Sequence, residues 1–250
     1  MRRRKRKSMN IQRLIASLIF VVFVGIIGYF NIPIFDFDNT QDNSIQSVSM
    51  QTSSFDISAI PKYTDEPYVV INENQPSFTE EDMKLNPFEK YGKLDGLGRC
   101  GAAYACVGIE TMPTEKRGDI SQIKPTGWHS TKYDIVDGKY LYNRCHLIGF
   151  QLTAENANKK NLITGTRYMN VEGMLPFENQ VAEYIEDTNN HVLYRVTPIF
   201  EGDNLVASGV QMEAKSIEDE GKGICFHVYV YNVQPGITIN YANGESWLVK

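Results

Sequence analysis

Between Tyr142 and Glu178 the chain gathers amide, cationic and carboxylate side chains around one histidine, His146. A histidine, with a pKa of about 6.5, can accept a proton from water at neutral pH. A neutral Asn oxygen suits Mg²⁺, which keeps most of its water shell and takes few protein ligands. An Arg can hold a phosphate through two parallel hydrogen bonds. These residue types therefore favour hydrolysis of a phosphodiester over acyl transfer.

The spacing of these residues resembles that of the bacterial DNA/RNA non-specific endonucleases, whose active site is a ββα-metal finger related to the His-Asn-His type. Their D-R-G-H motif is matched by N-R-C-H at residues 143–146. Their second motif is an Asn, an Asn nine residues later and a Glu eight residues beyond that, and it is matched by Asn161, Asn170 and Glu178. Weaker similarity to membrane-bound or secreted nucleases of Gram-positive bacteria extends over residues 94–247. The combined spacing carries the resemblance, because N-R-C-H alone would be a weak signal.

The resemblance implies a role for each matched residue. His146 would be the general base, and Arg144 would lie beside it, near the phosphate. Asn170 would be the direct ligand of a single Mg²⁺, for which Mn²⁺ could substitute, and Glu178 would contact the metal through water. Asn161 would hold the geometry of the site. Such a site would cut both DNA and RNA, would leave 5′-phosphates, and would show weak sequence preference because it contacts the nucleic-acid backbone.

The chain departs from the family pattern at three positions. Asn143 and Cys145 replace the Asp and Gly of the first motif, so a negative charge beside the base is missing. Some relatives carry an Arg one helical turn after the Glu, where this chain has Ala182. The cation that stabilises the transition state must then come from elsewhere, and the candidates for this substrate-binding role are Arg167, Lys159 and Lys160.

Two other classes of protein remain open. A membrane-tethered DNA-binding or DNA-uptake protein could keep the fold, with Asn143 and Cys145 marking lost chemistry. A contact-dependent toxin is a second enzymatic class, although such toxins usually carry long delivery domains. Substitution of His146 separates a receptor from a nuclease, because only the nuclease would lose activity.

The distribution of charge excludes a protein that binds nucleic acid through its overall charge. The chain has 250 residues, with 25 Lys and Arg against 30 Asp and Glu, a net charge of −5. Seven of the cations lie in residues 1–13, so the rest has 18 cations against 30 acids, a net charge of −12. Binding of a polyanion must therefore depend on a local site.

The N-terminus has the pattern of a membrane signal anchor. Residues 1–13 are basic, and residues 14–30 carry no charge, with the first acid at Asp36. We expect a transmembrane segment over residues 14–35 with residues 1–13 in the cytoplasm, because cations favour the inner side. A cleaved signal peptide is the alternative, although no clear small-x-small cleavage site follows. Residues 36–55 are polar and predict a flexible extracellular linker, which leaves residues 56–250 as the nuclease domain.

Hydrophobic periodicity in the remaining residues predicts an α+β domain. Strands are expected over residues 68–71, 98–108, 192–200, 205–212 and 224–233. Phe177, Val181, Tyr184 and Ile185 have the spacing of an amphipathic helix over residues 177–187. With the resemblance, these elements imply a central, mostly antiparallel β-sheet with a ββα-metal finger and flanking helices.

Cysteine placement leaves the disulfide pattern open. An oxidising compartment permits disulfides, but Cys100 and Cys106 bracket a predicted strand, whose residues span about 20 Å. Bridges would therefore link different segments, and four buried thiols are the alternative. The spacing matches no zinc motif. The remaining residues of interest, which we interpret as structural, are Trp128, His129, His191 and His227.

Overall fold

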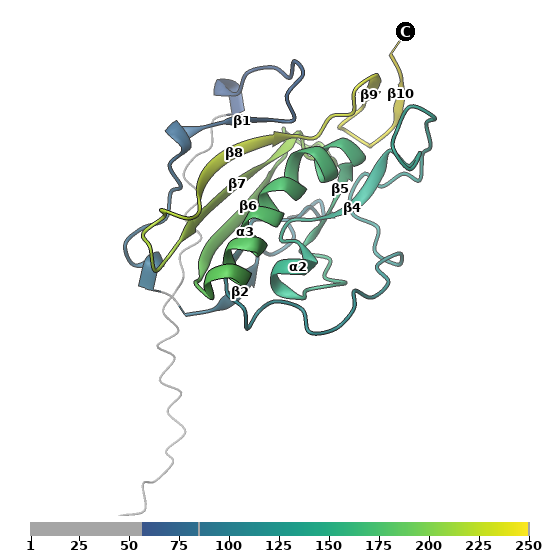
Figure 1. The fold of residues 1–250 in the computed structure, drawn as a ribbon. Helices are drawn as coiled ribbons and strands as arrows, with labels where there is room; N and C mark the ends of the chain where they lie inside the picture. The colour runs from purple at the N-terminus through teal and green to yellow at the C-terminus, as the bar shows by residue number, and fades with distance from the viewer. Residues whose placement is uncertain (1–56, 85, 250) are drawn as a thin grey trace, which may run out of the picture. The chain divides into compact units, whose positions relative to one another are not determined.

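Six strands form the main sheet in the order β1-β8-β7-β6-β3-β2, and every neighbouring pair is antiparallel. The computed structural model describes residues 57–84 and 86–249. The strands are β1 (Tyr68–Val70), β2 (Phe88–Tyr91), β3 (Ala103–Val107), β6 (Val192–Ile199), β7 (Gly209–Ser216) and β8 (Cys225–Tyr231). The predicted α+β class and antiparallel sheet are confirmed (Figure 1).

The proposed basic segment, membrane anchor and linker lie outside the described residues. Within the described part of the chain, no helix is long and apolar enough to cross a membrane.

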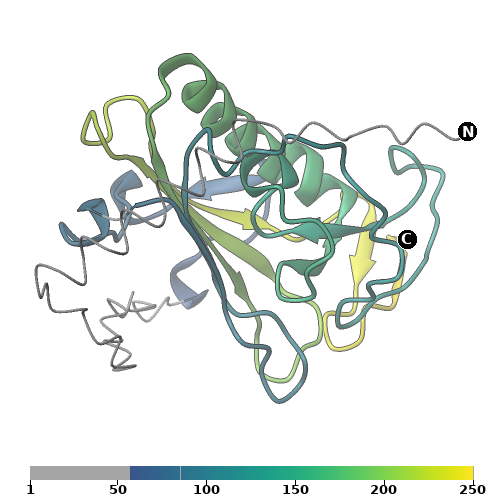
Figure 2. The same cartoon turned by 90° about the horizontal axis from the view of Figure 1, so that it is seen from below.

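The long helix α3 (Leu175–Thr188) covers one face of the sheet, as Figures 1 and 2 show. Its stripe of Val181 and Ile185 is fully buried and packs against residues of β3, β6, β7 and β8. Pro176 lies in the first turn, where its missing N–H costs no hydrogen bond. Asn189 ends the helix in a left-handed conformation, and its N–H bonds to the carbonyl of Ile185. The helix predicted over 177–187 is therefore confirmed, with one further turn divided between its ends.

The opposite face of the sheet has a smaller core. Tyr104, Cys106 and Leu193 are fully buried there under Phe78 and Met83. Phe78 precedes a short 3-10 helix, η3 (Asp82–Lys84), and two further 3-10 turns, η1 (Ile57–Ala59) and η2 (Asn72–Asn74), come earlier in the chain. The sheet is therefore covered on both faces, which explains why all five residues of β3 are buried.

Two of the predicted strands have different limits in the structure. The strand predicted over 98–108 is shorter, and the strand predicted over 205–212 begins only at Gly209. The N–H groups of Leu205 and Val206 instead bond to the carbonyls of Ala242 and Tyr241. These carbonyls lie in the turn between β9 (Ile237–Ile239) and β10 (Ser246–Leu248), which form a separate antiparallel hairpin. A long-range backbone contact, absent from the local pattern, therefore moves the start of β7.

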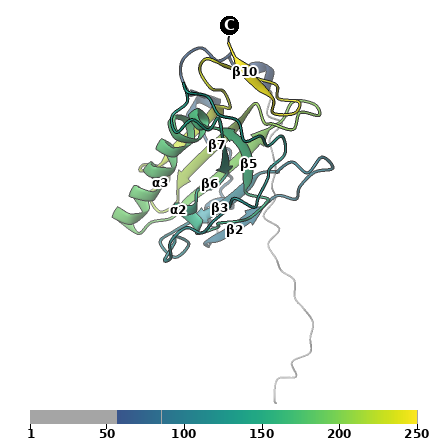
Figure 3. The same ribbon diagram turned by 90° about the vertical axis from the view of Figure 1, so that its right-hand side faces the viewer.

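A second hairpin and the start of α3 form the ββα unit. Strands β4 (Tyr142–His146) and β5 (Leu162–Thr166) pair antiparallel, with His146 opposite Leu162. The short helix α2 (Phe150–Thr153) follows β4. After β5 the chain forms a π-helical turn, η4 (Met169–Met174), that leads directly into α3. Figure 3 shows α2 beside α3, and residues of β4, β5 and α2 pack into the same core as α3. This order of elements is that of the predicted ββα finger.

None of the four cysteines forms a disulfide. Cys100, Cys106 and Cys145 are buried thiols, and Cys225 is half-buried. The structure therefore agrees with the alternative of four thiols, and the expected disulfides between different segments do not form.

Candidate active site

A groove of about 1040 Å³ lies along the ββα unit. Its walls are β4, the starts of α2 and α3, the π-turn, and part of the long loop between β3 and β4. The charged residues that line it are one acid, Glu178, and the four cations Arg117, Lys124, Arg144 and Arg167. This local excess of cations differs from the acidic composition of the domain, and it suits a polyanionic ligand.

His146 lies at the end of β4, buried in the wall of the groove. Its Nε2 lies 2.8 Å from the carbonyl oxygen of Asn156, an acceptor, so this nitrogen carries the proton of the neutral ring. Its Nδ1 lies 3.2 Å from an NH2 of Arg117 and keeps the lone pair. The pKa of His146 is lowered to about 4, mainly by burial and in smaller part by the charge of Arg117, while the bond to Asn156 opposes the shift. His146 is therefore neutral at physiological pH.

Asn170 and Glu178 supply the oxygen donors of the groove. Asn170 is half-buried in the π-turn, a feature that often occurs at functional sites. Burial raises the pKa of Glu178 to about 7, while Arg117 opposes the rise. A cation beside this carboxylate would offset the cost of its burial. Among the described residues no group of three or more His, Cys, Asp and Glu side chains forms a metal cluster. The amide oxygen of Asn170 and the carboxylate of Glu178 are hard donors of the kind that fits a hydrated cation such as Mg²⁺.

Asn161 fixes the turn that follows His146. Its side chain is fully buried, and its Oδ1 accepts a hydrogen bond of 2.9 Å from the N–H of Ile148. Its Nδ2 donates a bond of 3.0 Å to the carbonyl of the same residue. The paired bonds join the start of β5 to the turn after β4, which is consistent with the predicted role in site geometry.

Arg144 lies in the groove, but most of its guanidinium is already bonded. Its Nε and an NH2 donate to the carbonyls of Ile123 and Ser121, and its guanidinium carbon lies 4.2 Å from the ring centre of Trp128. Trp128 in turn packs against a small core around Leu141 and Tyr142. Arg144 therefore anchors the β3–β4 loop against β4 while it borders the groove, and Trp128 has the packing role that we predicted.

The three candidate cations separate in the structure. Arg167 lines the groove and forms an ion pair of 2.8 Å with Asp137. Lys159 is exposed and borders a different, much smaller cavity of about 130 Å³. Lys160 is exposed and lines neither cavity. Of the three, only Arg167 is placed to contact a molecule that binds in the groove beside His146.

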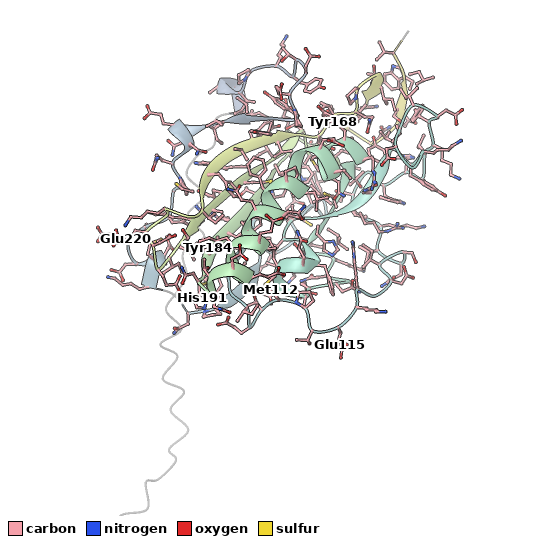
Figure 4. The ribbon with its side chains drawn as sticks, in the orientation of Figure 1. Met112, Glu115, Tyr168, Tyr184, His191 and Glu220 are labelled. Carbon is pink, nitrogen blue, oxygen red and sulfur yellow. The ribbon has the colours of Figure 1, made fainter. Side chains whose placement is uncertain are left out.

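Arg117 is the cation that sequence reasoning missed. It lies on the exposed β3–β4 loop, two residues after Glu115, which is labelled at the edge of the molecule in Figure 4. No motif or periodicity marks this loop, and 28 residues separate Arg117 from His146 in the chain. Its contact with Nδ1 of His146 appears only in the tertiary structure.

The three remaining histidines make hydrogen bonds within the fold. His129 contacts the carbonyl of Asn243, although it also borders the groove. His191 lies between Glu110 and Glu218, near the end of α3 (Figure 4). His227 contacts the carbonyl of Gln75 through Nδ1. These contacts agree with the structural interpretation.

The antiparallel sheet and the ββα unit match the ββα-metal nuclease fold, and the following solved structures are similar to this chain. NucA from Streptococcus agalactiae with no metal bound is 26% identical, with a TM-score of 0.65 over 77% of this chain and 92% of that chain. The same protein with magnesium bound is 27% identical, with a TM-score of 0.64 over 72% and 86%. Sda1 nuclease with bound zinc is 28% identical, with a TM-score of 0.54 over 65% and 81%.

A family model described as DNA/RNA non-specific endonuclease matches residues 79–218, more than half of the chain. The protein therefore belongs to the DNA/RNA non-specific endonuclease family, and its resemblance to that family is confirmed.

Proposed function

We propose that this protein is an extracellular, sugar-non-specific endonuclease that hydrolyses phosphodiester bonds of DNA and RNA with one Mg²⁺ and leaves 5′-phosphates. The observation that carries the proposal is the meeting, in one cationic groove, of neutral His146 with the oxygen donors Asn170 and Glu178. Membership of the nuclease family supports the reaction class. The magnesium in NucA and the zinc in Sda1 support a divalent cation.

His146 acts as the general base through Nδ1, because Nε2 is protonated and bonded to Asn156. Nδ1 takes a proton from the water that attacks phosphorus, and the bond from phosphorus to the 3′-oxygen breaks. The NH2 of Arg117 contacts Nδ1 when no substrate is present. A bound phosphate draws the guanidinium to its own oxygens, since a charge-assisted bond to phosphate is stronger than one to neutral imidazole. Substrate binding therefore both exposes the base and places a cation beside the developing charge.

Asn170 would hold the cation as a direct ligand, and Glu178 would contact it through water. When bound there, Mg²⁺ would supply positive charge that stabilises the phosphoryl transition state. Mn²⁺ is the expected substitute. Asn161 keeps the turn of His146 in place relative to β5, and Arg144 and Arg167 contact flanking phosphates.

The assay that tests the proposal incubates the purified full chain with supercoiled plasmid and with RNA, in Mg²⁺ or in chelator. We expect cutting of both substrates in Mg²⁺ only, and loss of cutting in Asn170→Ala. A folded chain that binds DNA but cuts neither substrate would overturn the proposal in favour of a surface DNA-binding or uptake protein.

The location outside the cell is part of the proposal. Residues 1–13 form the cytoplasmic segment, 14–35 the signal anchor, 36–55 the linker and 56–250 the nuclease domain. The one-sided basic charge of the N-terminus supports this orientation. The proposed partners are then the membrane, through residues 14–35, and the nucleic-acid backbone, through the groove.

Gly149 provides the space for the carboxylate of Glu178. A Cβ added at residue 149 would lie 2.6 Å from Oε2 and 3.0 Å from Oε1 of Glu178. In Gly149→Ala the flexible carboxylate must move while the backbone stays in place. We expect the Mg²⁺ concentration for half-maximal cleavage to rise about 10-fold, as for other changes next to a metal ligand.

The matched control for this prediction is Gly96→Ala, because a Cβ at residue 96 meets no atom within 4 Å. It should leave the Mg²⁺ requirement unchanged. Equal Mg²⁺ requirements in Gly149→Ala and the wild type would contradict a metal role for Glu178.

A further inference from the structure

The thiol of Cys145 contacts the proposed metal ligand directly. Its Sγ lies 3.0 Å from Oδ1 of Asn170, and the side chain is fully buried. A thiol carries one proton and a carboxamide oxygen only accepts, so the S–H donates to Oδ1. The strand that places His146 in the groove therefore also contacts the Asn170 side chain, through the preceding residue.

This contact bears on which atom of Asn170 a cation meets. The oxygen and the NH2 of an Asn side chain are nearly equal in shape, so shape alone does not fix the orientation of the amide. Only the oxygen can ligate a cation. It has two lone pairs, so it can accept the S–H and still bind a metal. A flipped amide would instead direct its NH2 at the sulfur, a weak acceptor, and would leave the S–H only the more distant Sδ of Met174, at 3.5 Å, and carbonyl of His146, at 3.8 Å.

The surrounding structure holds the thiol in this position. The Sδ of Met174 lies 3.5 Å from the Sγ of Cys145. On the neighbouring strand, Gly165 leaves room for it, since a Cβ at residue 165 would lie 2.7 Å from the Cβ and 3.2 Å from the Sγ of Cys145. The hairpin is therefore shaped to contain a side chain at a position where the first motif of the family has glycine.

We propose that Cys145 is a positioning residue whose thiol fixes the carboxamide oxygen of Asn170 as the cation-binding atom. The proposal rests on the proposed function, because it takes Asn170 as the metal ligand. In this interpretation the cysteine that stands at the glycine position of the first motif contributes to the metal site, and it is not a sign that the catalytic activity has been lost.

Calorimetric titration of Mn²⁺ into the tag-free full chain tests this role without reference to cleavage. Cys145→Ala and Cys145→Val remove the donor, the second without leaving a cavity because valine is slightly larger than cysteine, whereas Cys145→Ser retains a donor. We expect Mn²⁺ affinity to fall about 10-fold in the Ala and Val variants and to stay within about 3-fold in the Ser variant. Circular dichroism and the Tm establish that each variant is folded, and either donor-free variant suffices if the other does not fold.

Cys106→Ala is the matched control, because Cys106 is equally buried but lies in the core on the opposite face of the sheet. It should lower the Tm by creating a cavity and leave Mn²⁺ affinity unchanged. Asn170→Ala should lose the Mn²⁺ binding that the wild type shows.

Different results would contradict the role of Cys145 and the assignment of Asn170 as a metal ligand. Wild-type Mn²⁺ affinity in the donor-free variants, together with loss of binding in Asn170→Ala, would overturn the role of Cys145 and leave the nuclease proposal intact. Equal binding by the wild type and Asn170→Ala would overturn the metal assignment, and the role of Cys145 with it.

Discussion

Replacement of His146 by alanine should reduce the rate of cleavage of plasmid and RNA by about 10²- to 10⁴-fold, the usual contribution of a general base. The cause is the loss of Nδ1, the ring nitrogen that faces Arg117 across the groove and keeps a lone pair. Affinity for nucleic acid should change little, because the groove cations remain. Single-turnover cleavage rates and fluorescence anisotropy with a labelled oligonucleotide measure the two quantities separately.

His129→Ala is the control for this prediction, since His129 also borders the groove but bonds to the carbonyl of Asn243. We expect its cleavage rate to stay within a few-fold of the wild type. If His146→Ala kept a tenth or more of wild-type activity in a folded protein, another group would have to be the base.

Arg117→Ala should reduce cleavage by about 10²-fold, because in the proposed mechanism the guanidinium moves from His146 to supply a donor and a charge to the reacting phosphate. The same change should alter the pH profile. Burial is the main cause of the low pKa of His146, about 4, and the charge of Arg117 lowers it further. Without that charge the pKa rises, so the neutral base is lost at a higher pH as the solution is acidified. The acid limb of kcat/KM, measured at saturating Mg²⁺, should therefore move to higher pH.

The neighbouring Lys116 provides the control, since it is exposed on the same loop and does not line the groove. Lys116→Ala should leave both the rate and the acid limb unchanged. A parallel loss of activity in the two variants would indicate a general electrostatic effect of the loop, and an unmoved acid limb in Arg117→Ala would show that the guanidinium does not act on His146.

The local part of the fold was predictable from the sequence. The apolar spacing from Phe177 to Ile185 predicted α3, because a helix must bury one stripe of its surface. The ββα unit was predicted through the resemblance of the 143–146 motif, and of the spacing of Asn161, Asn170 and Glu178, to the endonuclease family. Where a strand limit was wrong, at Leu205 and Val206, a backbone contact with the distant β9–β10 turn was responsible.

Only the tertiary structure shows the contacts of the site that join residues far apart in the sequence. Arg117 reaches His146 from a loop without periodicity, whereas Lys159, much closer to the motif in sequence, lies at another cavity. In the sequence Cys145 is only a departure from the glycine of the family motif, and its contact with Asn170 is visible only in the tertiary structure. Local pattern determines secondary structure because it depends on neighbouring residues. Which side chains share a groove depends instead on the path of the loops, and a loop without a repeating pattern leaves that path to long-range packing.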